Sequence, residues 1–311
     1  MSGRASKSER RKLIRAISIV LATVLFFVAV VGIIQWWEDG QGGEVAKPHD
    51  EPKLNTYIDT LLIMGIDKSQ QSYGTKQADF IMLFVIDDYT KSYTALQINR
   101  DTMTEVNILD ISGNKVIDSV TKQITLAYSE GDGKKISCRN MVDSVSKLMG
   151  GINIDSYISV SMDAVPTFND FVGGVEVEVL DDFTGIDDSL VKGQKITLMG
   201  ESALTYVRTR QGLEDSSNEH RMVRQRQYLE GLYEKSVAAS KKNGNFAEEA
   251  LKNIEGHVVS SCSLSTLDKL LEYEPKGIIT LEGENRKGEQ YMEFYPDEEF
   301  LNKTVTELFY K

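Results

Sequence analysis

The sequence predicts an α/β protein with a mixed central β-sheet sandwiched by helices, preceded by one N-terminal transmembrane helix. Three short segments rich in apolar and β-branched residues lie at 60–66, 80–86 and 92–98, and helical patterns alternate with strand patterns after them. An uncharged, mostly apolar run of 22 residues occupies 16–37. Hydrophobic residues make up 41% and charged residues 26% of the chain, which excludes wholesale disorder and a many-span membrane protein.

The apolar run at 16–37 is predicted to be a membrane anchor. A helix of this length reaches about 33 Å, which is enough to cross a hydrocarbon layer of about 30 Å. Basic residues precede the run and Glu38 and Asp39 follow it, so the positive-inside rule places residues 1–15 in the cytoplasm and the bulk of the chain outside. The alternative is a cleaved signal peptide, but its apolar core would be shorter and would end at a small-residue cleavage site.

This anchor divides the chain into four predicted segments. They are a cytoplasmic tail (1–15), the anchor (16–37), a linker rich in Gly, Pro and acidic residues (38–56) and an extracytoplasmic domain (57–311) with core motifs at 60–230. The tail holds six basic residues and one acidic residue, so the formal charge of −12 is the sum of a +5 tail and a −17 remainder. Such an acidic domain is not expected to bind nucleic acid.

The expected elements follow in chain order. The strands at 60–66 and 80–86 are almost continuously apolar, which predicts central strands covered on both faces, and the short loop at 87–91 predicts an antiparallel connection to 92–98. The later elements are a hairpin (106–111 with 115–117), a helix (135–149), a strand (157–162), a helix (164–172), a strand (175–180), helices at 201–207 and 219–239, two amphipathic helices after Phe246, a hairpin across 278–294 with its turn near Glu284 and Asn285, and a last helix after Pro296.

The cysteines and histidines do not indicate a zinc enzyme. The three histidines, His49, His220 and His257, are scattered, and neither they nor the cysteines show metal-site spacing. Cys138 and Cys262 would lie in an oxidising compartment, where a disulfide is possible. Free buried thiols agree with the sequence equally well.

Charged residues stand at the ends of the three expected strands, where sheet proteins often place function. Asp67 ends the first strand, Asp79 begins the second, and Arg100 and Asp101 follow the third. Aspartates at strand ends also form turns. Position alone therefore leaves both interpretations open.

A dense group of arginines lies further along the chain. Five arginines fall within nineteen residues, together with Gln225: they are Arg208, Arg210, Arg221, Arg224 and Arg226. Arg221, Arg224 and Gln225 share one face of a helix, whereas Arg208 and Arg210 share a side only if the chain is extended there. Arginine binds phosphate oxygens bidentately, so the group facing carboxylates indicates a phosphorylated substrate. The alternative is a set of surface ion pairs with the many acidic residues.

The order of motifs resembles the LytR-CpsA-Psr family of bacterial cell-wall enzymes. The resemblance covers about 60–228, and its motifs are LLIMGID (61–67), ADF (78–80), INRDT (98–102), GINIDSYISVSMD (151–163), DFVGGVEVEV (170–179), GESALTYVRTR (200–210) and HRMVRQRQ (220–227). The resemblance implies a magnesium-dependent phosphotransferase. Such an enzyme moves a glycopolymer, for example teichoic acid or capsule, from undecaprenyl pyrophosphate to a muramic-acid hydroxyl of peptidoglycan.

The resemblance also implies roles for particular residues. Asp67 and Asp79 look like the magnesium ligands, and Asp101 is a candidate for activating the acceptor hydroxyl or for fixing Arg100, which is the other candidate catalytic residue. The implied pyrophosphate ligands are Arg100, Arg208, Arg210, Arg221, Arg224 and Gln225. A long prenyl chain would need an apolar groove, and Val165, Phe168, Phe171 and Val172 could line it or could simply be core residues. The implied location is the outer side of the cytoplasmic membrane, with a single span.

The sequence departs from the family pattern at three places. Gln77 and Ala78 stand where Arg-Ser is usual, Asn99 stands where Pro is usual, and the stretch around Asn218 and His220 replaces a Gly-Asp-x-Gly segment. Two alternatives follow: a protein that binds polyprenyl pyrophosphate with weakened or no turnover, and a pyrophosphatase that acts on such lipids. A transcriptional regulator is not expected, because fifteen cytoplasmic residues are too few for a helix-turn-helix.

Overall fold

The computed structural model describes residues 53–68, 76–240, 242, 249, 252–263, 266, 269 and 273–311. The predicted tail and anchor, and nearly all of the predicted linker, lie outside these residues. Within the described part of the chain, no helix is both long and apolar enough to cross a membrane. The anchor at 16–37 and the boundaries of the four predicted segments therefore stay predictions.

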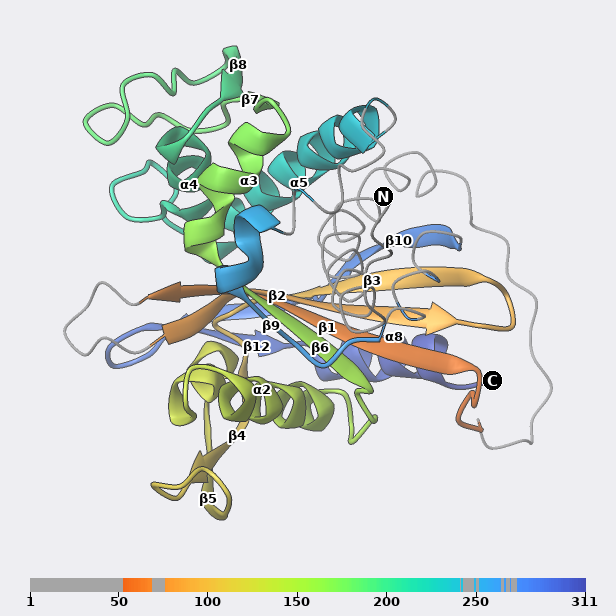
Figure 1. The fold of residues 1–311 in the computed structure, drawn as a ribbon. Helices are drawn as coiled ribbons and strands as arrows, with labels where there is room; N and C mark the ends of the chain where they lie inside the picture. Colours follow the sequence, from red (N-terminus) through yellow and green to blue (C-terminus); the bar gives the residue numbers. More distant parts are fainter. Residues whose placement is uncertain are drawn as a thin grey trace, which may run out of the picture.

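A six-stranded mixed sheet forms the centre of the fold (Figure 1). In spatial order its strands are β10 (Glu274–Thr280), β3 (Ser92–Ile98), β2 (Lys76–Asp87), β1 (Ile58–Lys68), β6 (Ser156–Ser161) and β9 (Val258–Ser260). The pairs β1–β2, β2–β3 and β6–β9 are antiparallel, and the pairs β1–β6 and β10–β3 are parallel. The predicted mixed sheet is confirmed.

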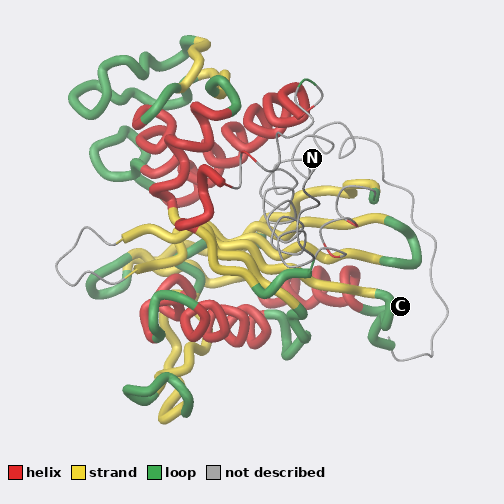
Figure 2. Tube along the Cα trace, viewed as in Figure 1, coloured by secondary structure: helices red, strands yellow, loops and turns green. Residues whose placement is uncertain are grey.

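Helices cover both faces of this sheet (Figure 2). On one face lie α3 (Val165–Phe171), α4 (Glu201–Arg208) and α5 (Asn218–Ser240), and on the other lie α2 (Lys135–Leu148) and α8 (Glu298–Phe309). The described residues also form three short 3-10 helices: η1 (Ile124–Glu130), η2 (Met162–Ala164) and η3 (Glu255–His257). The predicted sandwich of helices around a sheet is confirmed.

The alternation of side chains along β1 explains why the sheet is buried on both faces. Leu61 and Ile63 belong to the core under α3, α4 and α5, whereas Leu62 and Met64 belong to the core over α2 and α8. Successive side chains of a strand point to opposite faces, so a strand with a helical layer on each side must be apolar throughout. The continuous apolar pattern of the first two strands therefore predicted their central position correctly.

Three two-stranded ribbons are attached to this core. They are β4 (Met103–Leu109) with β5 (Val116–Gln123), β7 (Val175–Glu178) with β8 (Lys195–Leu198), and β11 (Gly283–Lys287) with β12 (Met292–Pro296). The predicted hairpin at 106–111 and 115–117 exists but is longer, because most of β5 is exposed and shows no apolar alternation. β8 was not predicted.

The predicted hairpin across 278–294 is wrong in its pairing. Residues 274–280 form β10, which pairs in parallel with β3 at the edge of the main sheet. The local hairpin instead joins β11 to β12, and its turn lies near Gly288, whose N–H donates to the carbonyl of Tyr291. The partner of an apolar strand is decided by distant residues, so the local pattern could not show it.

Two further expectations concern the C-terminal part of the chain. The two helices predicted after Phe246 fall largely outside the described residues. Cys138 is buried and Cys262 is half-buried, and both are free thiols. Burial raises the pKa of each thiol to about 11, so both are held in the protonated form at neutral pH.

Candidate functional site

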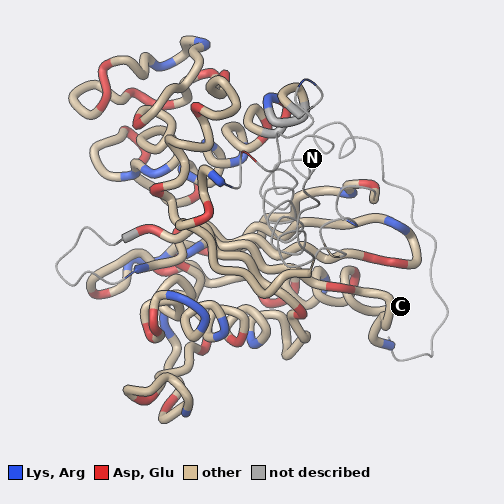
Figure 3. Tube along the Cα trace, in the orientation of Figure 1, with Lys and Arg blue, Asp and Glu red and all other residues tan. Residues whose placement is uncertain are grey.

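The ends of three neighbouring strands bring the predicted site residues together. β1 runs antiparallel to β2, and β2 runs antiparallel to β3, so the end of β1, the start of β2 and the end of β3 lie at the same end of the sheet. Asp67, Asp79 and Arg100 occupy these three positions. Figure 3 shows a middle of the sheet without charged positions, with positive and negative positions gathered toward its end beneath α4.

A β-bulge sets the position of Asp79. Gly65 pairs with Phe80 and Ile66 pairs with Ala78, so Asp79 is the extra residue of β2 between two paired positions. A bulge bends the strand and redirects a side chain, and bulges are common next to active sites. Here the extra residue is the carboxylate that the sequence marked as a candidate ligand.

Asp79 binds two arginines that are far apart in the sequence. Arg100 Nη1 donates to Asp79 Oδ1, and Arg221 Nη1 lies 2.9 Å from Asp79 Oδ2. Burial pushes the pKa of Asp79 upward, but the charges of Arg221 and Arg100 outweigh it and leave the pKa below its ordinary value. Gln77 joins the same group, because its Oε1 accepts a hydrogen bond of 2.7 Å from Arg100 Nη2.

Arg208 and Arg210 reach two other carboxylates. Arg208 is the last residue of α4, and Thr209 after it is extended, with φ −62° and ψ 136°. An extended chain was the condition under which both arginines could share one side, and the structure meets it. Arg208 Nε lies 2.5 Å from Asp67 Oδ2, and Arg210 Nη1 lies 3.3 Å from Asp101 Oδ2. Their side chains are 26% and 29% exposed, so a ligand from solvent can reach them.

Asp101 is the most protected carboxylate among these contacts, with 4% of its side chain exposed. Its Oδ1 accepts from Gln123 Nε2 at 2.9 Å and lies 3.3 Å from Arg100 Nε. Burial raises the pKa of Asp101, and the charges of Arg100 and Arg210 offset this only in part. A carboxylate with a raised pKa is suited to accept a proton in catalysis.

The structure does not bring Arg224 and Gln225 into this group. Arg224 has no exposed side-chain surface; its Nε lies 3.2 Å from Asp181 Oδ2, and its Nη2 donates to the carbonyl of Thr209. Gln225 Nε2 donates to the carbonyl of Val207 at 3.2 Å. Both side chains hold the segment that carries Arg208 and Arg210, and a direct contact of either with pyrophosphate stays a prediction.

Besides Gln77 and Gln123, three more site residues were not assigned roles from the sequence: Asn99, Asn218 and Glu219. Asn99 and Asn218, like Gln77, stand where the sequence departs from the family pattern. Asn218 Nδ2 donates to Asn99 Oδ1 at 2.7 Å, and Asn218 Oδ1 accepts from Arg221 Nε at 3.1 Å. Asn99 Nδ2 donates in turn to Glu219 Oε1 at 2.6 Å. The network ties the end of β3 to the first turn of α5 and fixes Arg221 against Asp79. The paired departures at 99 and 218 were the signal that could have indicated this contact.

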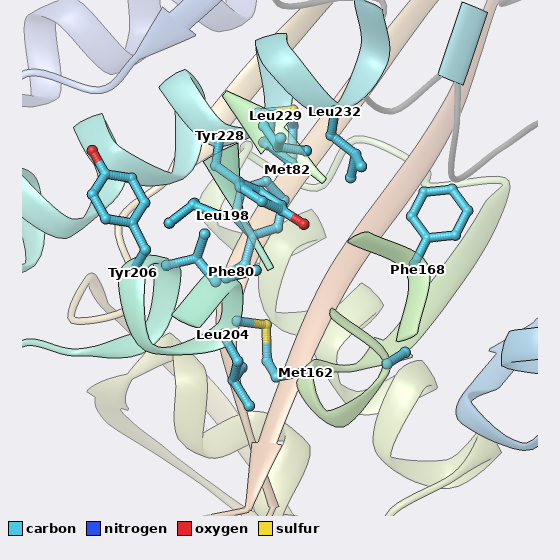
Figure 4. Packing of buried hydrophobic residues seen from close by; sticks show 14 of the residues in the cluster. Phe80, Met82, Met162, Phe168, Leu198, Leu204, Tyr206, Tyr228, Leu229 and Leu232 are labelled. Atoms are coloured by element: carbon cyan, nitrogen blue, oxygen red, sulfur yellow. The ribbon is translucent and has the colours of Figure 1, made fainter. Parts of the chain in front are cut away.

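An apolar cavity of about 90 Å³ adjoins the charged group. Figure 4 shows Phe80 from the sheet and Phe168 from α3 facing the α5 residues Tyr228, Leu229 and Leu232. All five line the cavity, as do Val165, Gly65 and Val207. Of the residues predicted for an apolar groove, Val165 and Phe168 line it, whereas Phe171 and Val172 pack in the surrounding core.

The residues at the strand ends suit a magnesium ion only in part. Asp67 and Asp79 place two carboxylates at one end of neighbouring strands, but Arg208 contacts Asp67, and Arg100 and Arg221 contact the two oxygens of Asp79. Mg²⁺ is usually held by one or two carboxylates together with phosphate oxygens and waters. Among the described residues, no group of three or more His, Cys, Asp or Glu side chains could hold a metal. The donor set therefore fits a cation shared with a bound phosphate, not a metal held by protein ligands alone.

Known proteins resemble this chain in sequence and in fold. The model of the LytR_cpsA_psr family matches residues 43–309. The polyisoprenyl-teichoic acid–peptidoglycan teichoic acid transferase TagV of Bacillus subtilis is 28% identical over 295 residues, which cover 87% of this chain and 71% of that protein. The corresponding TagU of Bacillus licheniformis is 26% identical over 328 residues, which cover 98% of each chain. The crystal structure of B. subtilis TagV matches with a TM-score of 0.59 at 25% identity, over 82% of this chain and 97% of that one.

Proposed function

The chain belongs to the LytR-CpsA-Psr family, and on this premise we propose that it is a phosphotransferase of the bacterial cell wall. It takes a glycopolymer from an undecaprenyl-pyrophosphate carrier and attaches it to a muramic-acid hydroxyl of peptidoglycan through a phosphodiester. The distant relatives TagV and TagU are named as transferases of teichoic acid from a polyisoprenyl carrier to peptidoglycan, which supports this donor and this acceptor.

The observation that carries the proposal is that the apolar cavity lies directly beside the cluster of charged site residues. At three places one residue lines the cavity and a nearby residue in the chain belongs to the charged group: Gly65 with Asp67, Phe80 with Asp79, and Val207 with Arg208. A ligand that fills both regions must be apolar at one end and anionic at the other. A polyprenyl pyrophosphate has this character, and the cavity of about 90 Å³ has room only for the first part of its chain, next to the pyrophosphate.

The charged group suits phosphoryl transfer. This reaction needs little covalent chemistry from the protein and depends on alignment and on charge stabilisation. Arg208 and Arg210 can bind the phosphate oxygens because they are partly exposed, and Arg100 and Arg221 add positive charge behind them. A magnesium ion held by Asp67 and Asp79 would neutralise further phosphate charge.

The proposed location completes the assignment. With the anchor at 16–37 in the cytoplasmic membrane and the domain outside, the site would meet a lipid carrier in the same bilayer. The linker at 38–56 would let the domain approach both the lipid surface and the wall polymer.

The test is a transfer assay with the full chain in detergent, a lipid-linked saccharide as donor and peptidoglycan as acceptor. We expect the wild type to form a phosphodiester-linked product and Arg208→Ala to lose it while its far-UV circular dichroism spectrum at the assay temperature stays that of the folded wild type. Arg286→Ala is the matched control, because its exposed side chain pairs with Glu284 outside the site. A wild type that forms no product, or an Arg208→Ala variant with full activity, would contradict the proposal.

One observation favours a second candidate function. Gln77 stands where family members usually have an arginine, so the site has one positive charge fewer. Arg100 already donates to Asp79 through Nη1 and to Gln77 through Nη2. A protein with this change could hold the lipid pyrophosphate or hydrolyse it with water as acceptor. The same assay separates these cases, because binding alone releases nothing and hydrolysis releases saccharide phosphate without a product on peptidoglycan.

A further inference from the structure

A second pocket, lined mostly by polar residues and with a volume of about 260 Å³, adjoins the arginine site. Asp101 and Arg210 belong to both the site and this pocket. Its other polar walls are Gln211, Asn218, Glu219 and Asn285, with two serines and a methionine. The volume is below the roughly 300–1,000 Å³ of pockets for drug-sized ligands, so it has room for a single small ring.

Three separate parts of the fold build this pocket. They are the end of β3, the loop from α4 to the start of α5, and the β11–β12 ribbon. The ribbon is fixed against Asp101 at two points. The N–H of Phe294 donates to the carbonyl of Asp101 at 2.9 Å, and Gln123 Nε2 bridges Asp101 Oδ1 and the carbonyl of Met292 at 2.9 and 2.7 Å. These hydrogen bonds fix the ribbon against Asp101, so the walls of the pocket have a defined position next to the site.

The charges of the walls exclude an anion as the preferred ligand. Asp101 and Glu219 contribute two carboxylates, against one guanidinium from Arg210. The remaining polar walls are amides and hydroxyls, which donate and accept hydrogen bonds without charge. Met292 adds an apolar surface. This combination suits a neutral ligand with many hydroxyl groups and one apolar face, which is the character of an N-acetylated sugar ring.

We propose that this pocket binds the acceptor sugar, with the reacting hydroxyl directed at Asp101. The inference rests on the proposed transferase function and deepens it. In the reaction the hydroxyl oxygen forms a bond to the phosphorus that carries the glycopolymer, and the bond from that phosphorus to the bridging oxygen breaks. The electron pair leaves with polyprenyl phosphate, and the hydroxyl proton passes to Asp101 Oδ2.

The position of Asp101 distinguishes the acceptor sugar from the first sugar of the donor. A base must touch the hydroxyl that attacks, and Asp101 is the carboxylate that both lines this pocket and contacts a phosphate-binding candidate, Arg210. The donor sugar carries no hydroxyl that reacts. The same neutral chemistry would nevertheless accept either sugar, so the experiment compares the two.

The experiment uses Gln211→Ala and Asn285→Ala in the full chain in detergent. Both residues line the pocket and are exposed, and they come from different parts of the chain, the loop before α5 and the β11–β12 ribbon. Losing one hydrogen bond of about 1.4 kcal/mol weakens binding about tenfold. We therefore expect the KM for peptidoglycan glycan strands to rise about tenfold in each variant, with the KM for the lipid-linked donor unchanged. Glu289→Ala, at the exposed turn of the same ribbon, is the matched control.

Binding is also measured without turnover, by ligand-observed NMR with a soluble GlcNAc–MurNAc fragment whose lactyl carboxyl group is capped as an amide, so that the probe is neutral. We expect the wild type and Glu289→Ala to bind it and the two pocket variants to bind it about tenfold more weakly. An unchanged acceptor KM in both variants overturns the inference and leaves the transferase function intact, as does an increase in the donor KM alone. If the wild type forms no product, the proposed function fails, and the binding of the fragment still decides whether the pocket recognises this sugar.

Discussion

The most direct test of the arginine site is Asp79→Asn, which removes one charge and almost no volume. Asp79 neutralises Arg100 and Arg221, whose side chains are 12% and 4% exposed. Removing one partner of a buried ion pair costs about 3–5 kcal/mol because the other charge stays buried. The partial exposure of Arg100 favours the lower value. About 3 kcal/mol corresponds to a fall in melting temperature of roughly 6–12 °C for a domain of this size.

An added anion is expected to restore much of this stability. If the arginines bind pyrophosphate, inorganic pyrophosphate takes the place of the missing carboxylate. A ligand at one hundred times its Kd stabilises the folded state by about 2.7 kcal/mol. We therefore expect pyrophosphate, in metal-free buffer, to raise the melting temperature of Asp79→Asn by several degrees and that of the wild type by less. The assay is differential scanning fluorimetry of the full chain in detergent.

The control for this experiment is Glu214→Gln. Glu214 pairs with Lys192 at 2.9 Å, but the two side chains are 75% and 52% exposed, and exposed pairs contribute about 0–1 kcal/mol. Its melting temperature is expected to stay near that of the wild type, with no added response to pyrophosphate. If Asp79→Asn melts like the wild type, or if pyrophosphate stabilises the variant no more than the control, the arginines are not an anion site held by Asp79.

Three further predictions address other parts of the site. The raised pKa of Asp101 means that the transfer rate should fall as the pH drops through a value above that of an ordinary aspartate, and a rate that stays flat to lower pH would argue against Asp101 as the base. Leu229→Trp should fill the apolar cavity and raise the KM for the lipid-linked donor at least tenfold, while the Kd for inorganic pyrophosphate, measured by calorimetry, is unchanged. Asn218→Ala should lower the free energy of unfolding in urea by about 1–3 kcal/mol, because it leaves a buried N–H of Arg221 without its acceptor; equal stability would mean that water replaces it.

The central layers of the fold could be predicted because their patterns are local. The apolar runs of β1 and β2 and the polar loop before β3 indicated central, antiparallel strands, and the structure confirms both. β5 was predicted too short because most of it is exposed and carries no apolar alternation, and β8 was missed because it spans only four residues. The pairing of β10 with β3 joins residues about 180 positions apart, and no local pattern reports such a contact.

The site could be predicted in its composition but not in its contacts. The strand-end positions of Asp67 and Asp79 were visible in the sequence, which left open whether the chain is extended after Val207. The structure shows the extension at Thr209 and brings Arg208 to Asp67. The spacing of Arg221 and Arg224 placed them on one face of a helix. It could not show that one reaches Asp79 and the other lies buried against Asp181. Only the surrounding residues decide which side chains of a helical face meet a ligand.

The sequence by itself determined the class of the fold, the residue types gathered at the arginine site and the family to which the chain belongs. Each depends on residue types and on spacings of a few residues, which hydrophobic periodicity and motif order report directly. Only the tertiary structure decided that Arg208 and Arg210 are each matched with an aspartate, that Asn99 and Asn218 form a bonded pair, and that a pocket lined mostly by polar residues opens beside Asp101. These features arise where three strand ends, two helices and a distant ribbon converge, and contacts between such distant segments depend on the packing of the whole domain.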